Sequence, residues 1–372
     1  MRDQRLKKLA EVLVHYSVAV KPGDFVLVSC QDIAVPWMVE VTEAAIKAGA
    51  HVETFIHSPD VDETLLRFGS EQQLIASRYL RETMMKRADV WLSAWGNRNT
   101  RAKTNILPEK MKLFSQGNAS WHRIYFDRIA DGSLRWCGTQ FPTEADAQEA
   151  SMSLREYEDF VYCAGLLDKD DPVTEWRRIR DEQNRWVHYL NKRKELHIIS
   201  RGTDIRVGIG GRKWINCAGN ENFPDGELFT APIKEEVNGC IAFSFPGIYM
   251  EREVEDICLE VKDGKIVTAT AKKGEDFLLS ILATDNGSAF FGEVALGTNY
   301  GIQKFTRNML FDEKIGGTIH FALGEAPKET GGINESAIHW DLLCNMKDEG
   351  KIYADGELFY ENGKFIEAVL SE

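Results

Sequence analysis

The chain lacks the excess of positive charge that an anionic partner requires. Its 372 residues carry 58 aspartates and glutamates against 45 lysines and arginines, a formal net charge of −13. Nucleic acids and anionic membranes are bound through basic patches. The charge balance therefore disfavours both as partners.

Three further absences narrow the class of protein. The seven cysteines are odd in number and include no C-x-x-C pair, which predicts free thiols in a reducing compartment. The N-terminus has no signal-type apolar core, and no apolar run approaches the length of a membrane span. No G-x-G-x-x-G motif follows the first strand pattern, so no dinucleotide cofactor is predicted. We expect a cytoplasmic protein.

The length suggests two domains, and 43% hydrophobic residues are enough to build their cores. Residues 1–194 alternate helical and strand patterns, which predicts an α/β N-terminal domain with a mostly parallel sheet, ending in a long helix that begins near Pro172. We expect helices at 4–15, 35–48, 70–87 and 108–116, and strands within 21–29 and at 51–56, 88–94 and 123–126. Residues 195–372 alternate with period two, which predicts a β-rich α+β C-terminal metal-binding domain.

Two histidines and an aspartate near the end of the chain indicate a metal site. His339 and Asp341 lie in S-A-I-H-W-D, and His320 lies nineteen residues earlier in T-I-H-F-A-L-G. Residues two apart in a strand point to the same face, so His339 and Asp341 aim together while Trp340 turns the other way. Imidazole and carboxylate are metal ligands.

Three glutamates stand in unusual surroundings for surface residues. Glu227 follows a Pro-Asp-Gly turn in N-F-P-D-G-E-L-F-T-A-P, and Glu293 lies in the almost wholly apolar F-G-E-V-A-L-G. A buried carboxylate requires a cation. Glu313 lies in L-F-D-E-K, where an ordinary solvated turn is the plainer alternative, as a strand edge is for Glu227.

Together these residues exceed what one ion needs. The candidate set is Glu227, Glu293, Glu313, His320, His339 and Asp341. Four carboxylates and two imidazoles suit two divalent ions held close together, and the apolar setting of Glu293 makes it the expected bridging ligand. Nitrogen and oxygen ligands without thiolate suit zinc, cobalt, manganese or iron.

At residues 195–345 the chain resembles the signature blocks of the thermophilic metallo-aminopeptidase family, the aminopeptidase T and aminopeptidase S group. The blocks are N-F-P-D-G-E-L-F-T-A-P, G-E-V-A-L-G, D-E-K-I-G-G-T-I-H-F-A-L-G and S-A-I-H-W-D. The resemblance implies metal ligands at the positions of Glu227, Glu293, His320, His339 and Asp341, with Glu313 an approximate match. It also implies a homodimer that uses two divalent metals such as zinc or cobalt to release N-terminal residues from peptides.

The chain departs from this family in one side chain and in a shorter stretch between the two histidines. Larger members carry a tyrosine seven residues after the first histidine, where this chain has Pro327. Tyr300 and Arg307 are the candidates to replace its help to the transition state. A related branch is similar to mononuclear iron dioxygenases that open hydroxylated pyridine rings with two histidines and one carboxylate.

The expected function is a metallo-aminopeptidase in which two metals activate a shared water, with Glu293 bridging and Glu313 a terminal ligand or the general base. One alternative is a mononuclear non-haem iron ring-cleaving dioxygenase with its iron on His320, His339 and Asp341. In that enzyme Glu227 and Glu293 would not be metal ligands. A non-catalytic metal-binding protein is the other alternative. The number and kind of bound metal ions distinguish the first two.

Overall fold

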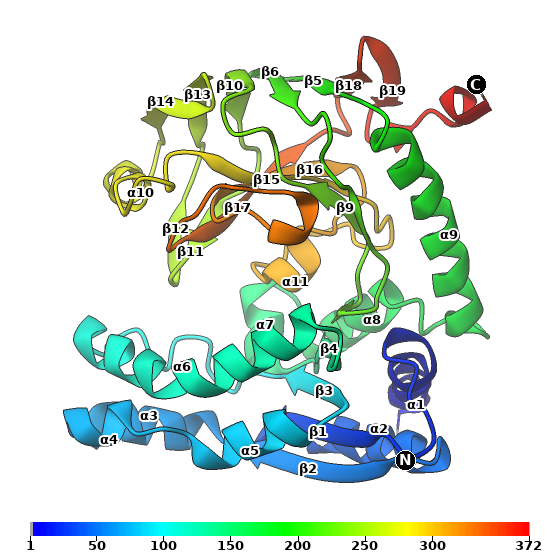
Figure 1. Cartoon of the computed structure of the whole chain (residues 1–372), viewed down its shortest axis with the longest axis vertical. Helices are drawn as coiled ribbons and strands as arrows, with labels where there is room; N and C mark the ends of the chain where they lie inside the picture. Colours follow the sequence, from blue (N-terminus) through cyan, green and yellow to red (C-terminus); the bar gives the residue numbers. More distant parts are fainter. Residues whose placement is uncertain (1–2, 372) are drawn as a thin grey trace. The chain divides into compact units, whose positions relative to one another are not determined.

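The computed structural model describes residues 3–371, which form two compact units (Figure 1). The first consists of the chain up to Glu175 and of Gly219–Pro224; the second consists of Trp176–Ala218 and of the chain from Asp225 onward. The sequence pattern predicts a boundary near residue 195, whereas these units divide inside the long helix α9 (Pro172–Leu190). The reason is that Trp186 and Leu190 of this helix belong to the core of the second unit.

The first unit contains a five-stranded parallel sheet in the order β2-β1-β3-β4-β8. Its strands are β1 (Phe25–Gln31), β2 (His51–His57), β3 (Val90–Trp95), β4 (Arg135–Gln140) and β8 (Asn222–Phe223). The interior of β1 is buried along its whole length, as expected for a parallel strand covered on both faces.

The helices of this unit follow the predicted alternation, with two corrections. They are α1 (Gln4–Val12), α2 (Val35–Lys47), α3 (Pro59–Phe68), α4 (Glu71–Ile75), α5 (Tyr79–Arg87), α6 (Pro108–Ala130), α7 (Glu144–Glu149) and α8 (Leu154–Ala164). The helix expected at 70–87 is broken into α4 and α5 because Ala76 takes an extended ψ of 132°.

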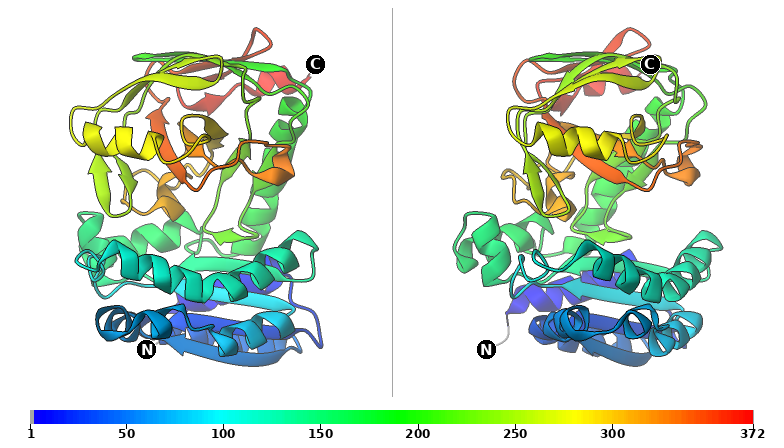
Figure 2. Two further views of the ribbon diagram at one scale, coloured as in Figure 1. Left: turned by 60° about the vertical axis from the view of Figure 1, so that its left-hand side comes forward. Right: turned by 90° about the vertical axis from the view of Figure 1, so that its left-hand side faces the viewer.

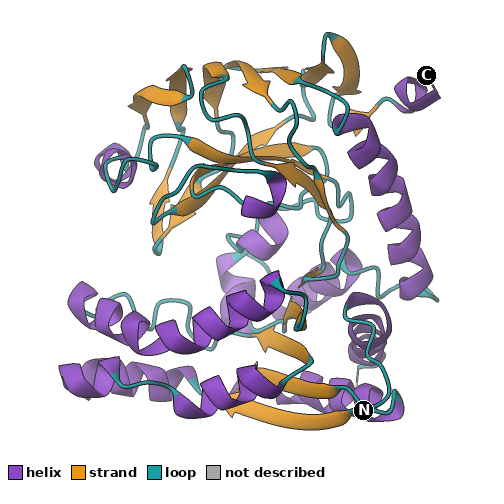
Figure 3. Ribbon diagram, in the orientation of Figure 1, coloured by secondary structure: helices purple, strands orange, loops and turns teal. Residues whose placement is uncertain are grey.

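The strand expected at residues 123–126 is wrong, because these residues lie in α6 (Figure 3). Four apolar residues of this helix are spaced one, three or four positions apart and pack beside a buried cluster that includes Leu27. They are Trp121, Ile124, Tyr125 and Ile129. This spacing is helical, and the fourth main strand is β4 instead.

The second unit is built from antiparallel strands (Figure 2). An eight-stranded sheet has the order β14-β13-β10-β6-β5-β18-β19-β20, and a five-stranded sheet has the order β17-β16-β15-β9-β7. The first comprises β5 (Glu195–Ser200), β6 (Thr203–Gly208), β10 (Val237–Ala242), β13 (Cys258–Lys262), β14 (Lys265–Thr270), β18 (Lys351–Ala354), β19 (Glu357–Glu361) and β20 (Lys364–Phe365). The second comprises β7 (Ile215–Cys217), β9 (Glu227–Thr230), β15 (Phe291–Gly297), β16 (Thr318–Gly324) and β17 (His339–Asn345).

A hairpin of β11 (Gly247–Tyr249) and β12 (Arg252–Val254) and the helices α10 (Glu275–Leu282) and α11 (Met309–Asp312) also belong to this unit. One continuous buried cluster takes side chains from both sheets, such as Ile205 and Val207 from the first and Val294 and Phe321 from the second. The expected fold class is confirmed: an α/β N-terminal part with a parallel sheet and a β-rich C-terminal part.

All seven cysteines are free thiols. Within residues 3–371, no helix combines the length and the apolar character that crossing a membrane requires.

Candidate metal centre

Three neighbouring strands bring four of the candidate ligands onto one face of the five-stranded sheet. Glu293 of β15 lies opposite Ala322 of β16, and Ala322 lies opposite Asp341 of β17. His320 precedes Ala322 by two residues and His339 precedes Asp341 by two, so all four side chains leave the sheet on the same side. Trp340 turns the other way, as predicted, and is buried.

The fifth candidate ligand joins this face from β9. Phe229 lies opposite Ala295, which lies opposite His320, and Glu227 precedes Phe229 by two residues. Gln183 of α9 fixes this strand by donating from Nε2 to the backbone carbonyl of Glu227 at 3.2 Å. The sixth candidate, Glu313, follows α11 directly.

A β-bulge in β15 sets the direction of Glu293. The register with β16 shifts between Phe291 and Glu293, and bulges of this kind re-aim side chains beside functional sites. Gly292 lies inside the bulge, where a Cβ would meet the carbonyl oxygen of Glu325 at 2.2 Å. Only glycine allows this close approach of the two backbones.

The six side chains form two groups. The His339 donor set is Glu293, His339 and Asp341; the His320 donor set is Glu227, Glu313 and His320. In each set the potential ligand atoms lie within 4.8 Å of one another. His339 Nε2 is 3.5 Å from Asp341 Oδ1. His320 Nε2 is 3.5 Å from Glu227 Oε2 and 3.3 Å from Glu293 Oε1, so Glu293 lies between the sets.

These distances fit divalent metal ions. Two ligand atoms bonded to one zinc at about 2.0–2.1 Å lie about 3.3–3.4 Å apart along a tetrahedral edge. Among the described residues, Glu227 Oε2 and His320 Nδ1 are buried without a hydrogen-bond partner. A buried carboxylate oxygen without a hydrogen bond is costly unless a cation binds it. The donor atoms therefore suit the metals that the sequence predicts.

The charges at the centre are strongly coupled. Burial raises the pKa of Glu227 and of Glu313, and the nearby Lys314 ammonium only partly opposes this effect. Burial would lower the pKa of His320, but its hydrogen bond to Glu293 and the charges of Glu227 and Asp341 raise it to about 9. Burial would raise the pKa of Asp341, but the hydrogen bond from His339 lowers it. The surroundings favour positive charge.

Lys314 is the residue that sequence reasoning missed. Its side chain is 1% exposed, and its Nζ lies 2.6 Å from Glu227 Oε1, 2.7 Å from Glu313 Oε1 and 3.4 Å from Asp225 Oδ1. The solvated turn offered as the alternative for Glu313 is therefore wrong. The available signal was that the charged triplet 312–314 stands between the apolar residues Phe311 and Ile315, which are both buried.

Comparison with known proteins identifies the family. The sequence profile of the thermophilic metalloprotease (M29) family matches residues 2–365. The chain belongs to this M29 family. It is therefore a metal-dependent hydrolase, which confirms the resemblance found at residues 195–345.

The relatives of this M29 chain are similar over nearly their full length. It is 28% identical to aminopeptidase T of Thermus thermophilus over 95% of this chain and 96% of the relative. It is 27% identical to aminopeptidase 2 of Geobacillus stearothermophilus over 93% of both chains. The solved structure of AmpT from Thermus thermophilus superposes with a TM-score of 0.86 at 25% identity, covering 98% of this chain and 99% of that one.

A second solved structure has a similar fold at a much lower sequence identity. The 2,5-dihydroxypyridine dioxygenase of Pseudomonas putida KT2440 superposes with a TM-score of 0.61 at 15% identity, covering 99% of this chain and 98% of that one. At this identity the likeness concerns the fold alone.

The two side chains considered as substitutes for the family tyrosine have partners elsewhere. The Tyr300 hydroxyl donates to the backbone carbonyl of Gly363 at 3.0 Å, and the Arg307 guanidinium pairs with Glu253. Both contacts lie outside the two donor sets. Their role in this M29 chain therefore stays a prediction that these contacts do not support.

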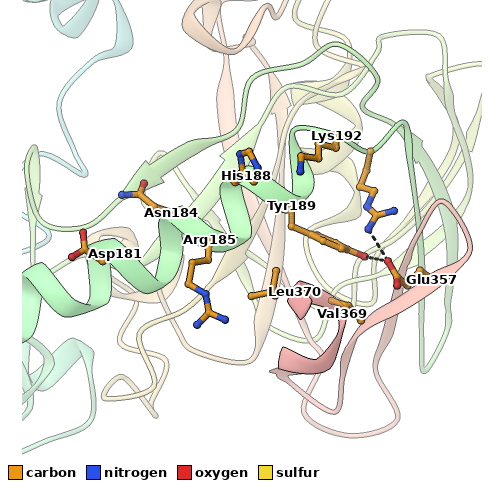
Figure 4. A pocket seen from close by; sticks show the side chains of 10 residues that line it. Asp181, Asn184, Arg185, His188, Tyr189, Lys192, Glu357, Val369 and Leu370 are labelled. Atoms are coloured by element: carbon orange, nitrogen blue, oxygen red, sulfur yellow. Dashed lines mark hydrogen bonds and ion pairs between the residues drawn. The ribbon is translucent and has the colours of Figure 1, made fainter. Parts of the chain in front are cut away.

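A separate pocket of about 750 Å³ lies along α9 (Figure 4). Its charged and aromatic lining is already paired in part, because Glu357 accepts hydrogen bonds from the Tyr189 hydroxyl and the Arg193 guanidinium, each at 2.7 Å. The pocket contains no member of the two donor sets. The chemistry of this M29 protein is therefore to be sought at the sheet face.

Proposed function

We propose that this M29 chain is an aminopeptidase that removes N-terminal residues from peptides with two divalent metal ions. The observation that carries the proposal is the position of Glu293 between two histidine-containing donor sets. Its Oε1 lies 3.3 Å from His320 Nε2, and it also belongs to the His339 donor set. The similarity to aminopeptidases T and 2 supports the reaction class.

The two donor sets differ in how far their histidines are exposed to solvent. When bound, the ions polarise the scissile carbonyl and bring the pKa of a water close to neutrality. The His339 side chain is 40% exposed, so its set lies at the open end of the centre where a peptide can enter. The His320 set is the buried end, because His320 is 1% exposed.

The structure bears on the two roles left open for Glu313. Its Oε1 lies 2.7 Å from the Lys314 ammonium. Its ligand atom also lies within 4.8 Å of those of Glu227 and His320, as expected for carboxylate and imidazole groups that bind one ion. We therefore favour Glu313 as a ligand of the His320 set, and Glu293 as the carboxylate shared between the ions. Zinc, cobalt or manganese as the metals, a homodimer and a cytoplasmic location stay predictions.

The test combines elemental analysis with hydrolysis of a panel of aminoacyl-anilides. With excess zinc or cobalt, the purified chain should hold about two ions and release aniline, and a chelator should stop the reaction. One iron per chain with oxygen uptake on a hydroxylated pyridine would instead establish the dioxygenase. Metal binding without turnover of any anilide would leave the non-catalytic alternative.

A further inference from the structure

We propose that Lys314 is a built-in cation that competes with the divalent ion of the His320 donor set, so that the two metal sites are unequal. The site on Glu293, His339 and Asp341 then binds its ion tightly, and the site on Glu227, Glu313 and His320 binds weakly and exchanges. This inference rests on the two sites of the proposed function and gives their order of occupation.

The contacts of Lys314 are confined to one of the two sets. Its closest partners are Glu227 Oε1 at 2.6 Å and Glu313 Oε1 at 2.7 Å, and both residues belong to the His320 set. The remaining ion pair is with Asp225, which belongs to neither set. Among the described residues, its ion pairs include no member of the His339 set.

The ammonium is directed at the ligands and not primarily at Asp225. An ammonium has three N–H donors, and three carboxylates surround this one. Asp225 is the most distant of the three at 3.4 Å, and its Oδ1 also accepts from the Gly226 N–H at 2.9 Å. A structural pair with Asp225 alone would not bring Nζ within 2.7 Å of two proposed metal ligands.

The backbone keeps Lys314 in place. Its N–H donates to the carbonyl of Phe311 at 3.1 Å, and its own carbonyl accepts from the Asn299 N–H at 3.0 Å. The side chain is 1% exposed, so no solvated position is close at hand for the ammonium. The positive charge therefore remains beside Glu227 and Glu313 when a divalent ion arrives.

The consequence follows from electrostatics in a buried site. Glu227 and Glu313 each have one oxygen committed to the ammonium, so each is a poorer donor to a second cation. Like charges that share carboxylates in surroundings of low dielectric repel each other strongly. Within residues 3–371, the ion pairs of the His339 set include no lysine or arginine. The affinity of this set should exceed that of the His320 set by at least about 100-fold.

The test is a cobalt titration of the full chain after its metals have been removed, followed by calorimetry and checked by elemental analysis after dialysis. The wild type should bind in two steps, with about one ion retained on dialysis. Lys314→Met keeps the aliphatic stem and removes the charge. It should tighten the weaker step by at least about tenfold, leave the tighter step within about threefold, and retain close to two ions.

Two further variants assign the steps. His339→Ala should remove the tighter step. Lys347→Met removes an ammonium from the same unit whose contact, Gln303 Oε1 at 3.1 Å, lies outside both sets, and it should leave both steps unchanged.

Two equal steps in the wild type would overturn the inference. So would a weaker second step in Lys314→Met, since that result would make the ammonium a positioning group for Glu227 and Glu313. If the variant does not fold, the wild-type titration alone decides between equal and unequal sites. Unequal sites without any anilide hydrolysis would contradict the aminopeptidase proposal but support the proposal about Lys314. A chain that binds no cobalt would overturn both proposals.

Discussion

The His339 imidazole donates a hydrogen bond from Nδ1 to the backbone carbonyl of Glu325, 3.0 Å away. This bond turns Nε2 toward Asp341 and Glu293, the other two members of its donor set. The Glu325 side chain is held in turn, because its Oε2 accepts from the Ser336 N–H at 2.7 Å. The backbone carbonyl of Glu325, a residue that is itself held by Ser336, therefore sets the direction of the imidazole.

Gly292→Ala tests this arrangement, together with the bulge that directs Glu293, without replacing any candidate ligand. The new Cβ would lie 2.2 Å from the Glu325 carbonyl oxygen, so the two backbones must move apart, and we expect the shift to disturb the hydrogen bond from Nδ1 to this carbonyl. Loss of such an outer hydrogen bond weakens metal binding by about 10–100-fold. Cobalt calorimetry and anilide hydrolysis should both show the loss.

The control for this variant is Gly210→Ala. Its Cβ would meet its nearest neighbours, atoms of Lys194, at 3.6 Å, which is an ordinary contact. It should behave as the wild type. Wild-type cobalt affinity in Gly292→Ala would show that the Glu325 carbonyl does not orient His339.

The parts of the centre that depend on local pattern could be predicted from sequence. Strand alternation places His339 and Asp341 on one face and Trp340 on the other, where Trp340 stacks on Tyr249 with ring centroids 5.4 Å apart. The apolar setting of Glu293 indicated a buried carboxylate, and its side chain is 9% exposed. Both inferences use only the neighbours of a residue along the chain.

The parts that depend on distant segments could not be predicted. The burial of Lys314 requires Asp225 and Glu227, which come from a turn and a strand far earlier in the chain. Residues 123–126 form part of a helix because the faces of α6 pack against other elements of the first unit. In both cases tertiary packing overrides a plausible local pattern.

His339→Ala and Asp341→Ala should each lower cobalt affinity and anilide hydrolysis by at least about 100-fold, because each removes a ligand atom from the His339 set. The fold should be kept, since His339 is partly exposed and Asp341 lies at the sheet face. Circular dichroism checks the fold. His197→Ala is the matched control, because this histidine of β5 pairs with Asp204 outside the centre and its loss should leave the rate unchanged.

Removing the metals should lower the melting temperature. Without ions, the buried carboxylates of Glu227 and Glu293 lose their compensating cations. An ion present at 100 times its Kd stabilises the folded state by about 2.7 kcal/mol. For a unit of this size that corresponds to roughly 5–10 °C, to be measured by calorimetry with chelator and with added cobalt. An equal melting temperature in both conditions would contradict binding to the folded state.

Asp285 should make stability depend on pH through the loop that precedes His339. Its carboxylate accepts from the N–H groups of Gly287 and Ala337 and from the Ser336 hydroxyl at 2.7–2.9 Å. These hydrogen bonds hold the pKa of Asp285 well below its usual range, and the bond from the Ala337 N–H contributes most to this shift. A lowered folded-state pKa contributes stability that is full above the ordinary value of about 3.9 and is lost as the pH falls through the folded value.

Asp285→Ala should therefore lower the urea midpoint at pH 7, and the difference from the wild type should shrink as the pH falls below about 4, where the carboxylate begins to bind protons in the unfolded wild type but not yet in the folded one. The measurement is urea unfolding of both proteins at pH 7 and pH 3. Asp348→Ala removes an exposed aspartate of the same unit and should give a small difference at both values. If the wild type and Asp285→Ala differed equally at pH 7 and pH 3, the carboxylate charge would not be what fixes this loop, and the position of His339 would depend on the backbone bond to Glu325 alone.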